Sequence, residues 1–150
     1  MASDWIDSEI QHIKARDNQR AAEAHLQPSR AEILQANAPQ FFTEVVREIR
    51  EVAERLNRAF PGDQSRHIEF NENTDALVLT FRNQTVLVRL DPSGRFVRLH
   101  PGGVHGVFRE SAFELAVDGQ GHVVSYHTEP HTVEGLVRAI LRPAFAALKL

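Results

Sequence analysis

The sequence predicts a single α+β domain with two layers, in which helices cover the apolar face of an antiparallel sheet of about six strands. The chain has 150 residues, which is the length of one domain. Apolar residues recur every three to four positions near both ends, the spacing of amphipathic helices. Between these ends, short alternating runs are separated by turn residues, as in a meander of strands. Two N-terminal helices and one C-terminal helix packed on the apolar sheet face give a closed arrangement.

Residues 1–28 predict an N-terminal helical arm. Ser3 can cap this helix, Ile6, Ile10 and Ile13 fall on one stripe, and Trp5 lies beside it. After Ile13 the segment is polar on every side, so the helix has little apolar surface to bury. We therefore expect it to rest lightly on the rest of the chain or to meet a partner.

Residues 29–62 predict the longest helix. Ser29 and Glu32 form a capping box for a short helical turn, and Pro39 suits the first turn of the main helix. A proline-glycine pair ends it. The apolar positions, spaced by three and four, are Phe42, Val45, Val46, Ile49, Val52, Ala53, Leu56 and Phe60.

Residues 66–127 predict the antiparallel sheet. The hairpin tips are placed at Asn73-Thr74, Asn83-Gln84 and Pro92-Ser93. This register puts Leu79 opposite both Ile68 and Val88, and Val88 opposite Val97. Because every partner is apolar, the first four strands share one apolar face.

A fifth and a sixth strand extend the same face. Phe113, Leu115 and Val117 pair with Val124 and Tyr126 through a turn around Gly119-Gln120-Gly121, so Tyr126 is expected to point inward. Residues 132–149 then predict the C-terminal helix, which Pro143 should end or kink. Thr132 caps this helix, and its apolar stripe is Val133, Leu136, Val137, Ile140, Leu141, Phe145 and Leu148.

The opposite sheet face is a mixture of apolar, aromatic and cationic residues. The predicted register places Arg89 beside Phe96 and Leu87 beside Arg98. Aromatic and guanidinium groups together are typical of protein interfaces. The predicted partner-binding residues are Trp5, Ile6, Ile10 and Ile13 of the arm, and Leu87, Arg89, Phe96, Arg98 and His100 of this face.

Three alternatives remain open for this face. The N-terminal helix can fold over it as a second core, or the face can bind another protein, including a second copy of the chain. It can also stack single-stranded nucleic acid, which needs two or more exposed aromatic residues. Phe96 stands alone there, and the formal net charge is −3, so the sequence argues against nucleic acid.

The stretch HPGGVHG at residues 100–106 is interpreted as a connection between strands. It begins a loop of residues 101–111 that is longer than most hairpin loops. A phosphate cradle would need this loop to lead into a helix N-terminus, whereas the sequence returns to a strand. A metal-dependent enzyme is the weaker alternative, with His100, His105, His127 and His131 as ligands, although their spacing fits no known zinc motif.

Composition narrows the classes of function. No apolar run of about 20 residues is present, so we expect no membrane span. The acidic N-terminus does not resemble a signal peptide, and the absence of cysteine fits the cytoplasm. No cofactor and no small-molecule substrate are indicated. The sequence therefore favours a small, soluble, non-enzymatic interaction module, expected to be a homodimer or a subunit of a larger assembly.

Overall fold

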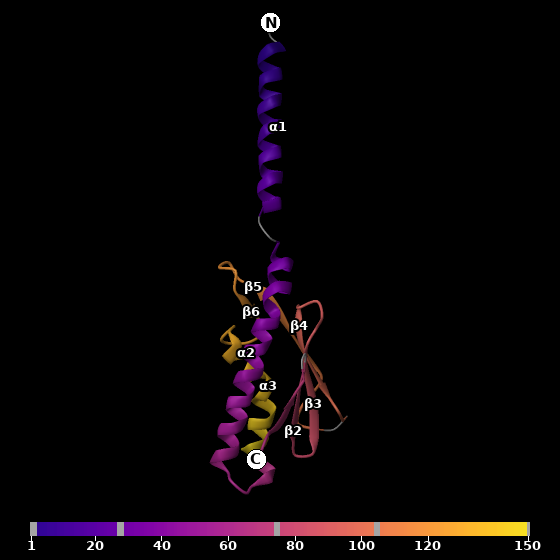
Figure 1. Ribbon diagram of the computed structural model, residues 1–150, viewed down its shortest axis with the longest axis vertical. Helices are drawn as coiled ribbons and strands as arrows, with labels where there is room; N and C mark the ends of the chain where they lie inside the picture. The colour runs from indigo at the N-terminus through magenta and orange to yellow at the C-terminus, as the bar shows by residue number, and fades with distance from the viewer. Residues whose placement is uncertain (1–2, 27–28, 74–75, 104–105, 150) are drawn as a thin grey trace.

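The computed structural model describes residues 3–26, 29–73, 76–103 and 106–149. Three α-helices are present in this part of the chain, α1 (Ser3–Leu26), α2 (Arg30–Ala59) and α3 (Val133–Leu148), and a short 3-10 helix, η1 (Gln64–Arg66), follows α2. Figure 1 shows α2 and α3 side by side against a sheet, with α1 extending away from this body. The predicted α+β class is confirmed, and the two layers are the sheet and the α2–α3 pair.

The sheet has six antiparallel strands in sequential order, which confirms the predicted meander. Leu79, Val88 and Val97, from three neighbouring strands, are all fully buried beneath the helices. The shared apolar face is therefore also confirmed. The strands are β1 (Glu69–Glu72), β2 (Ala76–Phe81), β3 (Gln84–Leu90), β4 (Phe96–Pro101), β5 (Ser111–Val117) and β6 (Val123–Ser125).

The pairing register of the first two hairpins differs from the prediction by two residues. Leu79 lies opposite Phe70 and Val86, not opposite Ile68 and Val88. Arg82 and Asn83 form the second tip, with φ angles of 50° and 65°. Two consecutive residues with positive φ define the tight hairpin turn whose twist matches the strands. A register shift of two residues leaves every side chain on the sheet face that was predicted for it. Thr74 of the first predicted tip lies outside the described residues.

The third hairpin has a four-residue loop rather than a tip at Pro92-Ser93. Val97 lies opposite Leu90, because the Asp91 N–H donates to the Phe96 carbonyl at 2.8 Å and closes the wider loop. Gly94 of this loop has a φ of +75°, and a Cβ added to it would lie 3.3 Å from the Cβ of Ala38. The loop therefore packs directly on α2.

One continuous α2 replaces the two predicted helical pieces, since Pro39 lies inside it. Ser29 Oγ accepts a hydrogen bond from the Glu32 N–H at 3.2 Å, so the predicted cap starts the whole helix. Ala38 and Phe41, on either side of Pro39, are buried against the body. Their burial offsets the one backbone hydrogen bond that proline removes.

α3 likewise continues through Pro143 to Leu148. The prediction that Pro143 could end this helix is therefore wrong. Ile140 and Ala144 are fully buried on either side of this proline. Near its start, Gly135 lies so close to the backbone of Pro130 that a Cβ would overlap the proline carbonyl. The loop before α3 is therefore packed against the helix at a position where only glycine fits.

The β5–β6 pairing corrects a second prediction. Leu115 lies opposite Ser125 and Val117 opposite Val123, so Val123 and Ser125 face the core. Tyr126, predicted to point inward, is 54% exposed. A shift of one residue moves a strand's side chains to the other face.

A tight loop fixes this pairing. Asp118 accepts the backbone N–H groups of Gln120 at 2.9 Å and His122 at 2.8 Å, and its own N–H donates to the His122 carbonyl. The chain therefore turns at the predicted glycines, in a register that the apolar pattern alone does not define.

Candidate interaction surfaces

The first surface is the arm stripe, which we define as Trp5, Ile6, Ile10 and Ile13 on α1. These side chains are between 43% and 64% exposed. All described side chains of α1, from Trp5 to Arg20, are exposed. Figure 1 shows α1 continuing beyond the first turns of α2 without folding back on the sheet. The alternative in which this helix covers the second sheet face is therefore wrong.

The second surface is the outer face, the sheet face opposite α2 and α3. Leu87 lies opposite His100, and Arg89 lies opposite Arg98. Phe96 lies opposite Glu114 rather than beside Arg89. The predicted neighbours Arg89–Phe96 and Leu87–Arg98 are therefore corrected by the same two-residue shift. The five predicted residues do share this face, and each is partly exposed.

Two arginines face each other directly on the outer face, and each has a partner that limits their repulsion. The Arg98 Nε donates to Asp91 Oδ2 at 3.0 Å, and its guanidinium lies 4.8 Å from the centre of the Phe96 ring. The Arg89 Nε donates to His100 Nε2 at 3.2 Å. Phe96 and Arg98 thus form a stacked pair, the cation–π arrangement common at interfaces.

Asp91 anchors this arrangement at the end of β3. The Ser93 backbone N–H and the Arg98 guanidinium hold the pKa of Asp91 below its ordinary value of 3.8. The carboxylate is therefore charged at neutral pH and keeps Arg98 over the Phe96 ring. Sequence reasoning missed Asp91 because the predicted register did not bring it near Arg98.

A groove of about 500 Å³ lies between the first turns of α2 and the second half of β5. Leu34 and Leu115 form part of its apolar wall, while Arg30, Glu114 and Tyr126 lie around it. β5 pairs with β4 up to Glu114 and with β6 from Leu115 onward, and the groove lies along this second part of β5. Tyr126 lines this groove rather than extending the row that contains Phe96.

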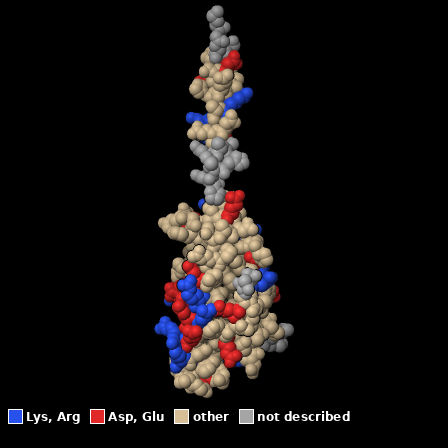
Figure 2. All heavy atoms as spheres, in the orientation of Figure 1, with Lys and Arg blue, Asp and Glu red and all other residues tan. Residues whose placement is uncertain are grey.

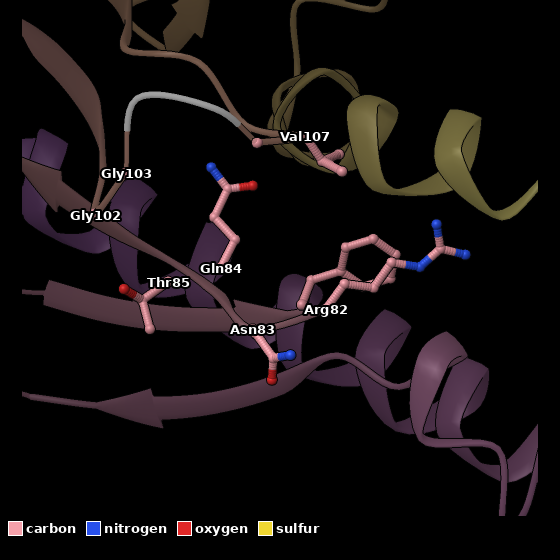
Figure 3. A pocket seen from close by; sticks show the side chains of 9 residues that line it. Arg82, Asn83, Gln84, Thr85, Gly102, Gly103 and Val107 are labelled. Carbon is pink, nitrogen blue, oxygen red and sulfur yellow. The ribbon is translucent and has the colours of Figure 1, made fainter.

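The glycine-rich connection forms a smaller pocket of about 230 Å³ beside the β2–β3 turn. Figure 3 shows the Gln84 side chain reaching from β3 toward this connection, between Gly103 and Val107. A Cβ at Gly106 would collide with the Gln84 amide. The chain continues from here into β5, and Phe108 is buried at 2% exposure. The described residues of this connection therefore serve packing, and no helix begins among them.

The histidines of the metal alternative have other partners. His100 accepts from Arg89, His127 Nε2 lies 3.7 Å from Glu114 Oε2, and His131 Nδ1 lies 3.1 Å from the Ser125 carbonyl. His105 lies outside the described residues. Over the described ranges, no three His, Asp or Glu side chains are placed to hold a metal ion together.

None of the helices in the described part of the chain combines the length and the apolar character needed to cross a bilayer. The fold and these surfaces define a small α+β protein with a projecting helical arm. Comparison of the chain with protein-family models, with curated proteins and with solved structures found no match.

Proposed function

We propose that the protein is a small cytoplasmic interaction module that binds another protein, or a second copy of itself, through the arm stripe and the outer face. It carries no catalytic machinery in this proposal. Its partner contacts two surfaces of different character, one a helix and the other a sheet. The absence of cysteine supports the cytoplasmic part of the proposal, because disulfide bonds are typical of proteins from oxidising compartments.

The projecting α1 is the single observation that carries this proposal. It is 24 residues long, which corresponds to about 36 Å at 1.5 Å per residue. Helices in water gain most of their stability from packing, and the described side chains of α1, from Trp5 to Arg20, are all exposed rather than packed on their own chain. Trp5 at 64% and Ile13 at 59% exposure are large apolar side chains without cover. A protein partner that buries them stabilises both the helix and the complex.

The outer face supports the same proposal independently. Leu87 and Phe96 are only partly covered by their neighbours, and the Arg98 guanidinium lies over the Phe96 ring. Arginine and aromatic groups in contact are enriched at the centres of protein interfaces. The face therefore offers an apolar centre with cationic groups around it.

The test places a photo-crosslinking amino acid at Ile13 or at Phe96 in the full-length chain, with Arg58 on exposed α2 as the control position. Any crosslinked protein is identified, purified and titrated against the native chain. We expect crosslinks at Ile13 and Phe96 and none at Arg58. The Ile10→Glu/Ile13→Glu and Phe96→Glu/Arg98→Glu variants should each weaken the purified complex. Crosslinking equal at all three positions, or binding unchanged in both variants, contradicts the proposal.

The alternative, binding of single-stranded nucleic acid, needs two or more exposed aromatic residues on one face. Phe96 lies on the outer face, whereas Tyr126, which is 54% exposed, lines the groove beside α2. Fluorescence anisotropy with a labelled oligothymidine separates the two proposals. The interaction module predicts no binding at physiological salt. Salt-sensitive binding that is lost in both Phe96→Ala and Tyr126→Ala favours nucleic acid.

A further inference from the structure

Four charged residues flank the arm stripe in a regular pattern. With 3.6 residues per turn, Ile6, Ile10 and Ile13 lie along one line of α1. Asp7 and Lys14 then lie along one side of this line, and Glu9 and Arg16 lie along the other. Each side therefore carries one acid and one base, seven residues apart. All of these side chains are exposed.

The order of the charges along α1 is the same on both sides. The acids are nearer the free end of the arm and the bases are nearer the body, as Figure 2 shows. Within the described residues, none of Asp7, Glu9, Lys14 and Arg16 has an ion-pair partner in its own chain. A helix with bases opposite these acids and acids opposite these bases would complement the pattern.

An antiparallel copy of α1 supplies this complement. When two identical helices run antiparallel, equivalent sides of their apolar stripes meet. With Ile10 of one chain opposite Ile13 of the other, Asp7 meets Lys14 and Glu9 meets Arg16. The two-fold symmetry repeats both pairs. A parallel pair would instead place Asp17 against Asp17 and Arg20 against Arg20, which are like charges on the contact line.

We infer that two copies of this chain associate through α1, as an antiparallel helix pair centred between Ile10 and Ile13. The inference rests on the proposed function, since it names the occupant of the arm stripe. The two bodies then lie at opposite ends of the paired arms. Both outer faces stay accessible in this dimer.

A charge-exchange experiment tests the partner. The full-length Asp7→Lys/Glu9→Lys variant has four bases flanking its stripe, and the Lys14→Glu/Arg16→Glu variant has four acids. We expect sedimentation velocity to show dimers for the native chain, monomers for each variant alone, and dimers again in their equimolar mixture. The matched control, Glu44→Lys/Glu54→Lys at exposed positions of α2, makes the same charge change as Asp7→Lys/Glu9→Lys and should stay dimeric. Dimers of each variant alone, or no recovery on mixing, overturn the inference.

A disulfide experiment tests whether the two helices run antiparallel. It is possible because the chain has no cysteine of its own. Antiparallel pairing places residue 6 of one chain opposite residue 17 of the other. Under mild oxidation, an equimolar mixture of full-length Ile6→Cys and Asp17→Cys should form the mixed disulfide, and each variant alone should form none. A disulfide-linked dimer of Asp17→Cys alone indicates parallel helices and overturns the inference.

Different results would overturn the antiparallel dimer and the proposed interaction function. A native chain that is monomeric at every concentration overturns the inference. If a different protein is still crosslinked at Ile13 and its purified complex is weakened by Ile10→Glu/Ile13→Glu, the proposed function stands. If no protein contacts either surface, both fail.

Discussion

The side-chain amide of Gln84 holds the backbone of Phe108 through two hydrogen bonds. Its Oε1 accepts from the Phe108 N–H at 3.1 Å, and its Nε2 donates to the Phe108 carbonyl at 3.2 Å. One residue at the start of β3 thus fixes the end of the glycine-rich connection, 24 positions later. The buried Phe108 ring is positioned in the core by this contact.

Replacement of Gln84 by Ala should destabilise the fold by about 1–3 kcal/mol, because two partly buried backbone groups lose their partners. Urea unfolding followed by circular dichroism measures this difference. Gln40→Ala, on the exposed surface of α2, is the control and should change stability by no more than about 0.5 kcal/mol. Equal effects of the two substitutions would contradict the role of Gln84.

Gly135→Ala should destabilise the protein by about 1–3 kcal/mol, as overpacking does, even though alanine is the better helix former. The added Cβ meets the backbone of Pro130, which has no free rotation to move aside. Gly103→Ala is the matched control, since nothing lies within 4 Å of its Cβ position. Thermal melts of the two variants provide the comparison, and a Gly135→Ala melt at or above the native value would be the contrary result.

Asp118 should make the fold sensitive to acid. The His122 backbone N–H, followed by that of Gln120, lowers the pKa of its carboxyl below 3.8 in the folded state. A lowered pKa contributes stability above the unfolded value of about 3.9, and this stability is lost as pH falls through the folded value. Asp118→Asn should therefore be less stable than the native chain at pH 7. Urea midpoints measured against pH should converge below the folded pKa, whereas a constant difference would exclude this linkage.

The arm should contribute nothing to the stability of the body. Ile10→Glu/Ile13→Glu should leave the urea midpoint of a dilute sample unchanged, because these side chains are exposed on α1. Ile49→Ala, in the fully buried part of α2, should cost about 2–5 kcal/mol. A large loss of stability in the arm variant would mean that α1 packs on the body in solution.

The apolar pattern predicted which face each of the first four strands buries, but not their exact partners. Leu79, Val88 and Val97 share the core as predicted, because a shift of two residues does not change the face. The true turns depend on local features that the apolar pattern does not contain. Arg82 adopts a positive φ, and Asp91 closes a four-residue loop. The hydrogen bond between Arg98 and Asp91 follows from that loop.

Tertiary packing explains the other differences. Pro39 was expected to start a helix and Pro143 to end or kink one, but burial of their neighbours keeps both helices continuous. β6 begins with two adjacent valines, so the apolar pattern does not define which side chains face the core. The Asp118 loop sets their direction, and Tyr126 is exposed. The helical arm itself was predicted from its short apolar stripe and the polar segment after Ile13, whereas the sequence left open whether this helix folds over the sheet.

The most direct test of the central claim, that the arm stripe of α1 contacts a second chain, is the solution mass of the full-length protein by light scattering. We expect the mass of two chains for the native protein at high concentration and the mass of one chain for Ile10→Glu/Ile13→Glu under the same conditions. A one-chain mass for the native protein at every concentration, or a two-chain mass for the variant, would contradict it.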